Sequence, residues 1–196
     1  MKTKSILKYF LFSASLLAGL NSCNYSNAKQ DDTKEIHTGY AEATPEDKVT
    51  ETDSKFLADV TVINLKEIQL GQLAQKLAKT EDVKALGKMM EKDHSACLKE
   101  VKSLAEKKSI AVETSLTDKE QEEYKKLNEL AGDDFDKEYC NKMIKGHKAA
   151  ISKFEKASSD CKDNDIKDFA TKTLPTLRIH LDHAADCQMK LEKQKS

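Results

Sequence analysis

Four segments of the chain carry apolar residues at the three-to-four-residue spacing of an amphipathic helix. This spacing predicts helices over residues 53–79, 81–108, 134–157 and 165–191. Short polar turns join the first helix to the second and the third to the fourth, so each pair is expected to form an antiparallel hairpin. The pattern therefore predicts an all-α domain, an antiparallel four-helix bundle over residues 53–192, followed by a tail of residues 193–196.

The long central connection contains a further helix signal. Thr117 and Glu120 have the spacing of a capping box, which predicts an extra short helix from there to about Leu130, ended by Gly132. Pro175 falls inside the fourth long helix, where it should remove a backbone hydrogen bond and kink the helix.

Composition agrees with a helical protein and narrows its partners. Charged residues make up 34% of the chain, and it has six Gly, two Pro and no Trp. The formal net charge is only -1, whereas nucleic-acid binders usually carry a clear basic excess. We therefore expect no nucleic-acid partner.

The N-terminus has the features of a targeting signal. Three lysines precede an apolar run from Tyr9 to Leu20, which is too short to span a membrane. The following "LNSC" resembles the lipobox of bacterial lipoproteins, which implies a signal peptide over residues 1–22 and acylation of Cys23. An ordinary secretory signal is the alternative. Residues 23–52 lack apolar periodicity and are predicted to be a flexible tether. The expected location is the bacterial cell envelope, anchored to the outer membrane through Cys23 and facing the periplasm.

Each long helix places one ionisable residue on its apolar stripe. These residues are Glu67, His94, His147 and His180. Glu67 and His94 stand at nearly equal distances from the first turn, so they should face each other, whereas His180 is expected about one helical turn off the level of His147. Buried ionisable groups need partners, so the four could hold a metal ion or form a metal-free hydrogen-bond network. The two interpretations have about equal support from the sequence.

If a metal binds, one Glu and three His favour a single transition metal, with zinc, copper and iron as candidates. Glu91, three residues before His94, has the spacing seen in dimetal carboxylate sites, but Ile144 stands at the matching position before His147. Asp93 could orient a histidine, His183 is a second-choice ligand, and Tyr139 could point toward the site. Met90 and Met143 are soft ligands in principle and core residues by their more usual role.

Four stretches resemble the bacterial envelope family called domain of unknown function 4142, a ferritin-like four-helix group. They are "KEIQLGQLA" (66–74), "VKALGKMMEKDH" (83–94), "FDKEYCNKMIKGH" (135–147) and "TLPTLRIHL" (173–181). The resemblance implies a ferritin-like fold and an envelope location, and it implies no particular reaction. Gly146 departs from the family's pattern, which usually has an aspartate before this histidine.

Four cysteines remain if Cys23 is acylated. Cys140 and Cys187 lie on the third and fourth long helices and are the candidate disulfide, since the envelope permits disulfides. Cys97, Cys140 and Cys187 also share the histidine stripes, where buried core thiols are commoner than thiolate ligands.

Two functions follow from these features. One is an envelope lipoprotein whose bundle core binds a metal; the other is a structural or interaction lipoprotein with a metal-free polar core and an envelope protein partner. No catalytic residue is assigned. Catalysis stays open, and the incomplete set of bridging carboxylates counts against an iron oxidoreductase.

Overall fold

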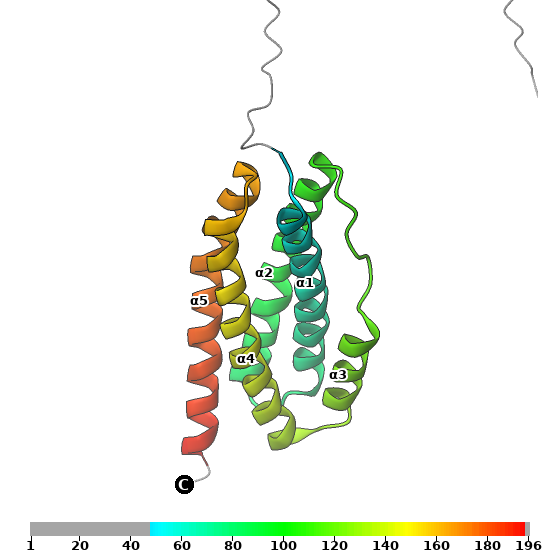
Figure 1. Ribbon diagram of the computed structural model, residues 1–196. Helices are drawn as coiled ribbons and strands as arrows, with labels where there is room; N and C mark the ends of the chain where they lie inside the picture. Colours follow the sequence, from blue (N-terminus) through cyan, green and yellow to red (C-terminus); the bar gives the residue numbers. More distant parts are fainter. Residues whose placement is uncertain (1–47, 195–196) are drawn as a thin grey trace, which may run out of the picture. The chain divides into compact units, whose positions relative to one another are not determined.

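The computed structural model describes residues 48–194, and these residues form an all-α structure (Figure 1). They contain five helices and no β-strand, which confirms the predicted all-α class: α1 (Glu51–Leu77), α2 (Glu81–Lys107), α3 (Asp118–Asn128), α4 (Gly132–Asp160) and α5 (Asn164–Lys193). The predicted signal peptide, the acylation site Cys23 and the tether as far as residue 47 lie outside the described residues. No helix within residues 48–194 is both long and apolar enough to cross a lipid bilayer.

The four long helices form two hairpins. α1 packs along α2 and α4 packs along α5, while the short α3 lies beside α1 (Figure 1). At the α1–α2 contact, Gly71 and Gly87 face each other so closely that a Cβ on Gly71 would stand 2.6 Å from the Gly87 carbonyl oxygen. The two inward-facing glycines therefore permit a close backbone approach that any larger residue would prevent.

Several helices begin or end at other residues than the sequence predicted. Thr50 and Asp53 form a capping box, so α1 begins at Glu51, inside the segment predicted to be tether. Gly132 does not end α3, which stops at Asn128; with φ +60 it is the first residue of α4. The predicted turn over residues 158–165 shrinks to three residues, because α4 continues to Asp160.

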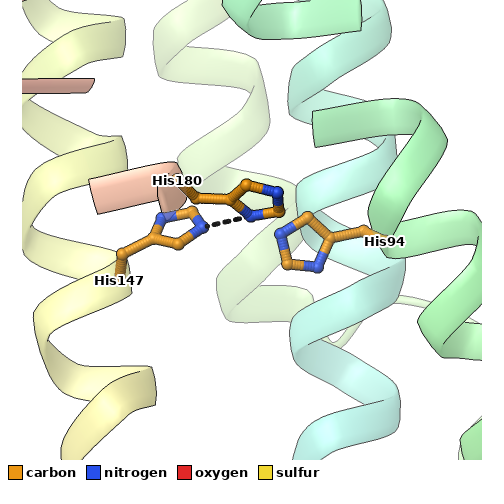
Figure 2. A group of neighbouring side chains, drawn as sticks. All are labelled: His94, His147 and His180. Carbon is orange, nitrogen blue, oxygen red and sulfur yellow. Dashed lines mark hydrogen bonds between the residues drawn. The ribbon is translucent and has the colours of Figure 1, made fainter. Parts of the chain in front are cut away.

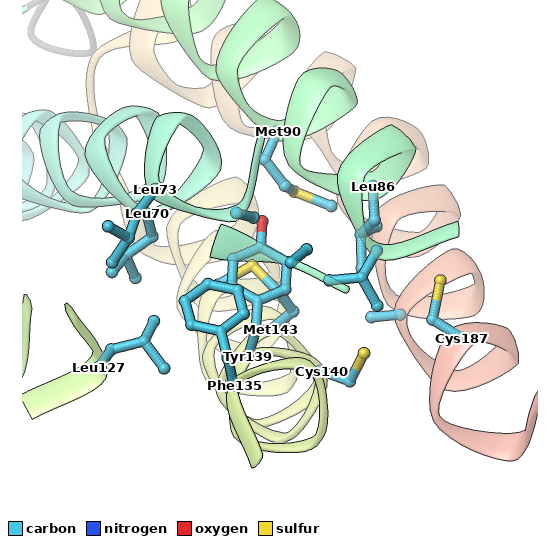
Figure 3. Packing of buried hydrophobic residues seen from close by; sticks show 14 of the residues in the cluster. Leu70, Leu73, Leu86, Met90, Leu127, Phe135, Tyr139, Cys140, Met143 and Cys187 are labelled. Atoms are coloured by element: carbon cyan, nitrogen blue, oxygen red, sulfur yellow. The ribbon is translucent and has the colours of Figure 1, made fainter. Parts of the chain in front are cut away.

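The interior is divided into three layers along the helices. One apolar cluster contains the C-terminal half of α1 and the N-terminal parts of α2 and α4, including Leu70, Met90 and Tyr139 (Figure 3). A second apolar cluster, with Phe56 and Phe154, occupies the other end. Buried polar residues lie at the helix positions between the two clusters: Asn64, Glu67, His94, His147 and His180.

Buried aspartates tie the two hairpins together at both ends. Asp136 of α4 accepts hydrogen bonds from the backbone N–H groups of Lys79 and Thr80 in the α1–α2 turn, both at 2.8 Å. At the opposite end, Asp53 of α1 accepts one from the Lys162 N–H in the α4–α5 turn at 3.0 Å. Each hairpin thus satisfies orphan donors in the turn of the other hairpin, which fixes their relative height.

Candidate metal centre

Three histidines from three helices meet in the polar layer. His94 of α2, His147 of α4 and His180 of α5 are 3%, 2% and 1% exposed, and their rings face one another (Figure 2). One ligand nitrogen from each ring lies within 4.8 Å of the others. His180 could have been about one turn off the level of His147, yet its Nδ1 lies 3.3 Å from Nε2 of His147.

Acceptors outside the cluster fix the protons on two of these rings. Asn64 donates its own amide to the Val60 carbonyl, so its Oδ1 accepts from His94 Nδ1 at 2.9 Å. His147 Nδ1 donates to the Met143 carbonyl oxygen at 2.8 Å. When both outward nitrogens carry the proton of a neutral imidazole, the lone pairs of both Nε2 atoms remain free.

Asp93 completes this arrangement on the third ring. His180 Nε2 donates to the Asp93 carboxylate at 3.1 Å, which leaves the lone pair of Nδ1 free in the neutral ring. Nδ1 of His180 and Nε2 of His147, joined by the dashed line in Figure 2, are then two acceptors 3.3 Å apart. A cation between them resolves the repulsion: two ligands at about 2.0–2.1 Å from a tetrahedral metal are roughly 3.3–3.4 Å apart.

Burial keeps His94 and His180 in the form that binds metals. Burial lowers the pKa of His94 well below its usual value, and the neighbouring His147, His180 and Lys66 lower it further. Burial also lowers the pKa of His180, although its hydrogen bond to Asp93 acts in the opposite direction. Neutral imidazole is the form of histidine that ligates a metal.

Glu67 lies in the same layer but outside the group of converging ligand atoms. Its side chain is 3% exposed, and Oε2 has no hydrogen-bond partner. Lys66 Nζ lies 3.8 Å from Oε1. Glu67, His94 and His147 together line a cavity of about 120 Å³ between α1 and α4. The structure therefore places Glu67 beside the same cavity as His94 and His147, but outside the ligand group of the three histidines.

Asp93, Glu91 and His183, the second-choice site residues, lie in different surroundings. Asp93 does orient a histidine, but this is His180 on another helix and not its neighbour His94. The Glu91 carboxylate instead accepts hydrogen bonds from Gln72 and Gln75 of α1. His183 is exposed and outside the ligand group.

Tyr139 is fully buried, and its hydroxyl has no hydrogen-bond partner in the described part of the chain. Burial, with a further contribution from the charge of Glu67, raises its pKa. Met90 and Met143 lie in the apolar cluster next to the polar layer, as core residues.

The candidate disulfide is not formed in this structure. Cys140 and Cys187 are free thiols, and a hydrogen bond between them raises the pKa of Cys140 and lowers that of Cys187. Cys97 is likewise a free thiol, and burial raises its pKa to about 11, which disfavours the thiolate that a metal would need.

Sequence reasoning missed Asn64, which is 2% exposed and orients His94. Its position three residues before Glu67 on the same stripe was the available signal. Asp136, fully buried, was missed as well, because its role depends on a turn 56 residues away in sequence.

Comparison with known proteins shows the family of the chain. The family model described as "Domain of unknown function (DUF4142)" matches residues 38–187, and the chain belongs to this family. No curated protein matches the chain. Among solved structures, a DUF305 fragment from Deinococcus radiodurans matches with a TM-score of 0.65 and 11% identity, covering 72% of this chain and 98% of the fragment. At this identity the match shows a shared fold alone.

Proposed function

We propose that this protein is a metal-binding member of its family, which holds one transition-metal ion between His94, His147 and His180. One observation carries the proposal: the outward nitrogen of each ring faces an acceptor, so the remaining nitrogens of the three rings converge in a buried space. There His94 Nε2 has no hydrogen-bond partner among the described residues, and His147 Nε2 has only His180 Nδ1. Buried polar atoms left in this state are costly, and a bound cation removes the cost.

The proposed scaffold is a ferritin-like four-helix bundle. Its support is the pair of long hairpins, α1–α2 and α4–α5, clamped together at both ends by Asp53 and Asp136. Bundle cores of this kind build metal sites from inward-facing side chains on facing helices.

Three imidazoles suit zinc, copper or iron, and these are the candidate ions. Storage, buffering or sensing of the ion are the roles that need nothing beyond the three histidines. Within residues 48–194, the Glu91 carboxylate is outside the group of ligand atoms and instead accepts hydrogen bonds from Gln72 and Gln75.

Metal analysis of the purified full chain tests the proposal. The chain is prepared without chelator or affinity-tag metal, dialysed against zinc, copper(I) or iron(II), and measured by elemental mass spectrometry. We expect near-stoichiometric binding of one of these ions, lost in His94→Ala and His147→Ala and kept in the exposed control His183→Ala. Equal metal content in all four proteins, or none in the wild type, would falsify the proposal.

We further propose that Cys23 is acylated and anchors the domain to the outer membrane of the bacterial envelope, facing the periplasm. The support is the N-terminal lysines, the short apolar run and the "LNSC" sequence. Fractionation of cells expressing the full chain, with labelled palmitate, should place label and protein in the membrane fraction. Cys23→Ser should lose the label; an unlabelled wild-type protein would contradict this location.

A structural role is the second candidate. The contact between His147 and His180 favours it, because a single added proton on His180 would turn that contact into a hydrogen bond without any metal. In that case the histidine variants lose melting temperature, the wild type binds no metal, and the search turns to an envelope protein partner.

A further inference from the structure

We infer that the three-histidine centre keeps a fourth position open for a solvent-derived ligand, water or hydroxide, that small monoanions can replace. Glu67 holds this ligand by a hydrogen bond, and the cavity between α1 and α4 is its route from the surface. The inference rests on the proposed metal site and adds an exchangeable ligand to it.

Unpartnered polar groups mark the place. Glu67 Oε2 and His94 Nε2 are both buried without a hydrogen-bond partner in the described part of the chain, and both residues line the same cavity. Its volume of about 120 Å³ is enough for several water molecules or one small ligand. His147, a second member of the ligand group, also lines it. A ligand in this cavity can therefore touch a metal held by the histidines and the carboxylate of Glu67 together.

The position of Glu67 makes it a partner of the ligand and not a ligand of the metal. Its oxygens are outside the set of atoms that lie within 4.8 Å of one another. Three histidines plus one exchangeable oxygen ligand is a common arrangement for zinc and related ions that keep an open position. A carboxylate at the edge of such a site accepts the hydrogen bond that bound water or hydroxide donates.

Small residues on α4 leave the route open. A Cβ built on Gly146 would lie 3.5 Å from Glu67 Oε1, with nothing nearer, so the missing side chain leaves space beside the carboxylate. Ala149 and Ala150 line the same cavity. Glycine within a helix costs about 1 kcal/mol relative to alanine, and free space at the Glu67 carboxylate is a reason to retain it.

Charge at the cavity favours an anion over a neutral molecule. Lys66 and Lys153 both line it, with side chains 22% and 38% exposed. Lys153 also pairs with Asp59, and Lys66 lies near Glu67, so neighbouring carboxylates neutralise part of the positive charge of the two lysines. Together with the metal charge they favour a small monoanion that enters from solvent.

Cobalt(II) and azide provide the test. The full chain is loaded with cobalt(II), whose visible absorption strengthens when coordination falls from six to four ligands, and is then titrated with azide. We expect an intense cobalt spectrum that changes and saturates with azide. Glu67→Gln should retain cobalt and bind azide about tenfold more tightly, because the amide removes a negative charge and supplies a donor. Glu91→Gln, a carboxylate outside the cavity, should behave as the wild type.

Gly146→Leu closes the proposed route. It should retain cobalt and weaken azide binding about tenfold or more, because the added side chain occupies the space beside Glu67. Circular dichroism confirms that each variant is folded before its titration.

The outcomes separate the two proposals. A chain that takes up no cobalt overturns the metal site and the open position together. Cobalt bound with an azide-insensitive spectrum overturns only the open position. Loss of cobalt in Glu67→Gln, to the extent seen in His94→Ala, makes Glu67 a metal ligand and overturns its role as a partner of the exchangeable ligand.

Discussion

The seam between α1 and α2 and the seam between α1 and α4 use glycine for opposite purposes. At the first, Gly71 and Gly87 bring two backbones together until added Cβ atoms would lie 2.6 and 2.8 Å from the facing carbonyl oxygens. At the second, Gly146 leaves space beside a buried carboxylate, and a cavity of about 120 Å³ opens there. Glycine therefore permits close backbone packing between α1 and α2, and it leaves room for a cavity between α1 and α4.

Hydrogen bonds of buried aspartates hold both ends of the contact between α1 and α4. Asp136 and Asp53 fasten α4 and α1 to the turns of the opposite hairpin, whereas the middle carries Glu67 and the three histidines. With polar contacts at both ends, the middle of the contact between α1 and α4 can contain a cavity. Four substitutions or conditions sharpen this comparison, from the largest expected effect to the smallest.

Asp136→Ala should cause the largest loss. It leaves the N–H groups of Lys79 and Thr80 and the Thr80 hydroxyl without their acceptor, so we expect the free energy of unfolding to fall by about 3–4 kcal/mol. Asp133→Ala is the matched control. Asp133 forms an exposed ion pair with the Lys79 ammonium, so its removal should lower the free energy of unfolding by less than about 1 kcal/mol. Equal urea midpoints for the two variants would contradict the clamp.

Gly71→Ala should open the close seam. Its new Cβ would meet the Gly87 carbonyl oxygen at 2.6 Å and the Glu91 backbone nitrogen at 2.9 Å, and backbone cannot move aside cheaply. We expect a loss of about 2–3 kcal/mol, measured by thermal and urea unfolding. An unchanged melting temperature would show that α1 and α2 are less tightly packed here.

Lowering the pH should destabilise the metal-free protein through the buried histidines His94 and His180. The folded pKa values of His94 and His180 lie below the unfolded value of about 6.5, so the unfolded chain binds more protons as the pH falls below that value. Stability is therefore fully present above about pH 6.5 and declines below it, by at most about 1.4 kcal/mol per pH unit for each histidine.

Urea unfolding between pH 7 and pH 5.5 measures this slope. His94→Gln should flatten it, whereas the exposed control His183→Gln should leave it unchanged. Identical slopes in the wild type and His94→Gln would mean that burial does not hold His94 neutral.

Gly146→Ala should give the smallest change and the opposite sign from Gly71→Ala. The new methyl group makes only an ordinary contact with Glu67 Oε1 at 3.5 Å, and alanine favours the helix by up to about 1 kcal/mol. A modest rise in melting temperature is expected. A fall comparable with that of Gly71→Ala would show that the second seam is as tight as the first.

The main elements could be predicted from residues near each other in the chain. Apolar spacing located all four long helices, and the Thr117–Glu120 spacing located α3. Local capping decided the ends less reliably: Thr50 and Asp53 extended α1 into the predicted tether, and Gly132 began a helix that it was expected to precede.

The candidate site shows the same division. Periodicity placed Glu67 and the three histidines on inward faces, and all four are buried. It could not give their mutual geometry: His180 meets His147 directly, Asp93 serves a histidine on another helix, and Asn64 orients His94 from α1. These contacts depend on the relative height and rotation of whole helices, which no local spacing specifies.

By itself, the sequence determined which segments are helical and which side of each helix is buried, because both follow from spacing along one chain segment. Only the tertiary structure decided which polar groups meet and which stay unpaired. Asp53 and Asp136 set the heights of the hairpins through turns far away in sequence, and that register brings three imidazole rings together while leaving Glu67 beside an open cavity.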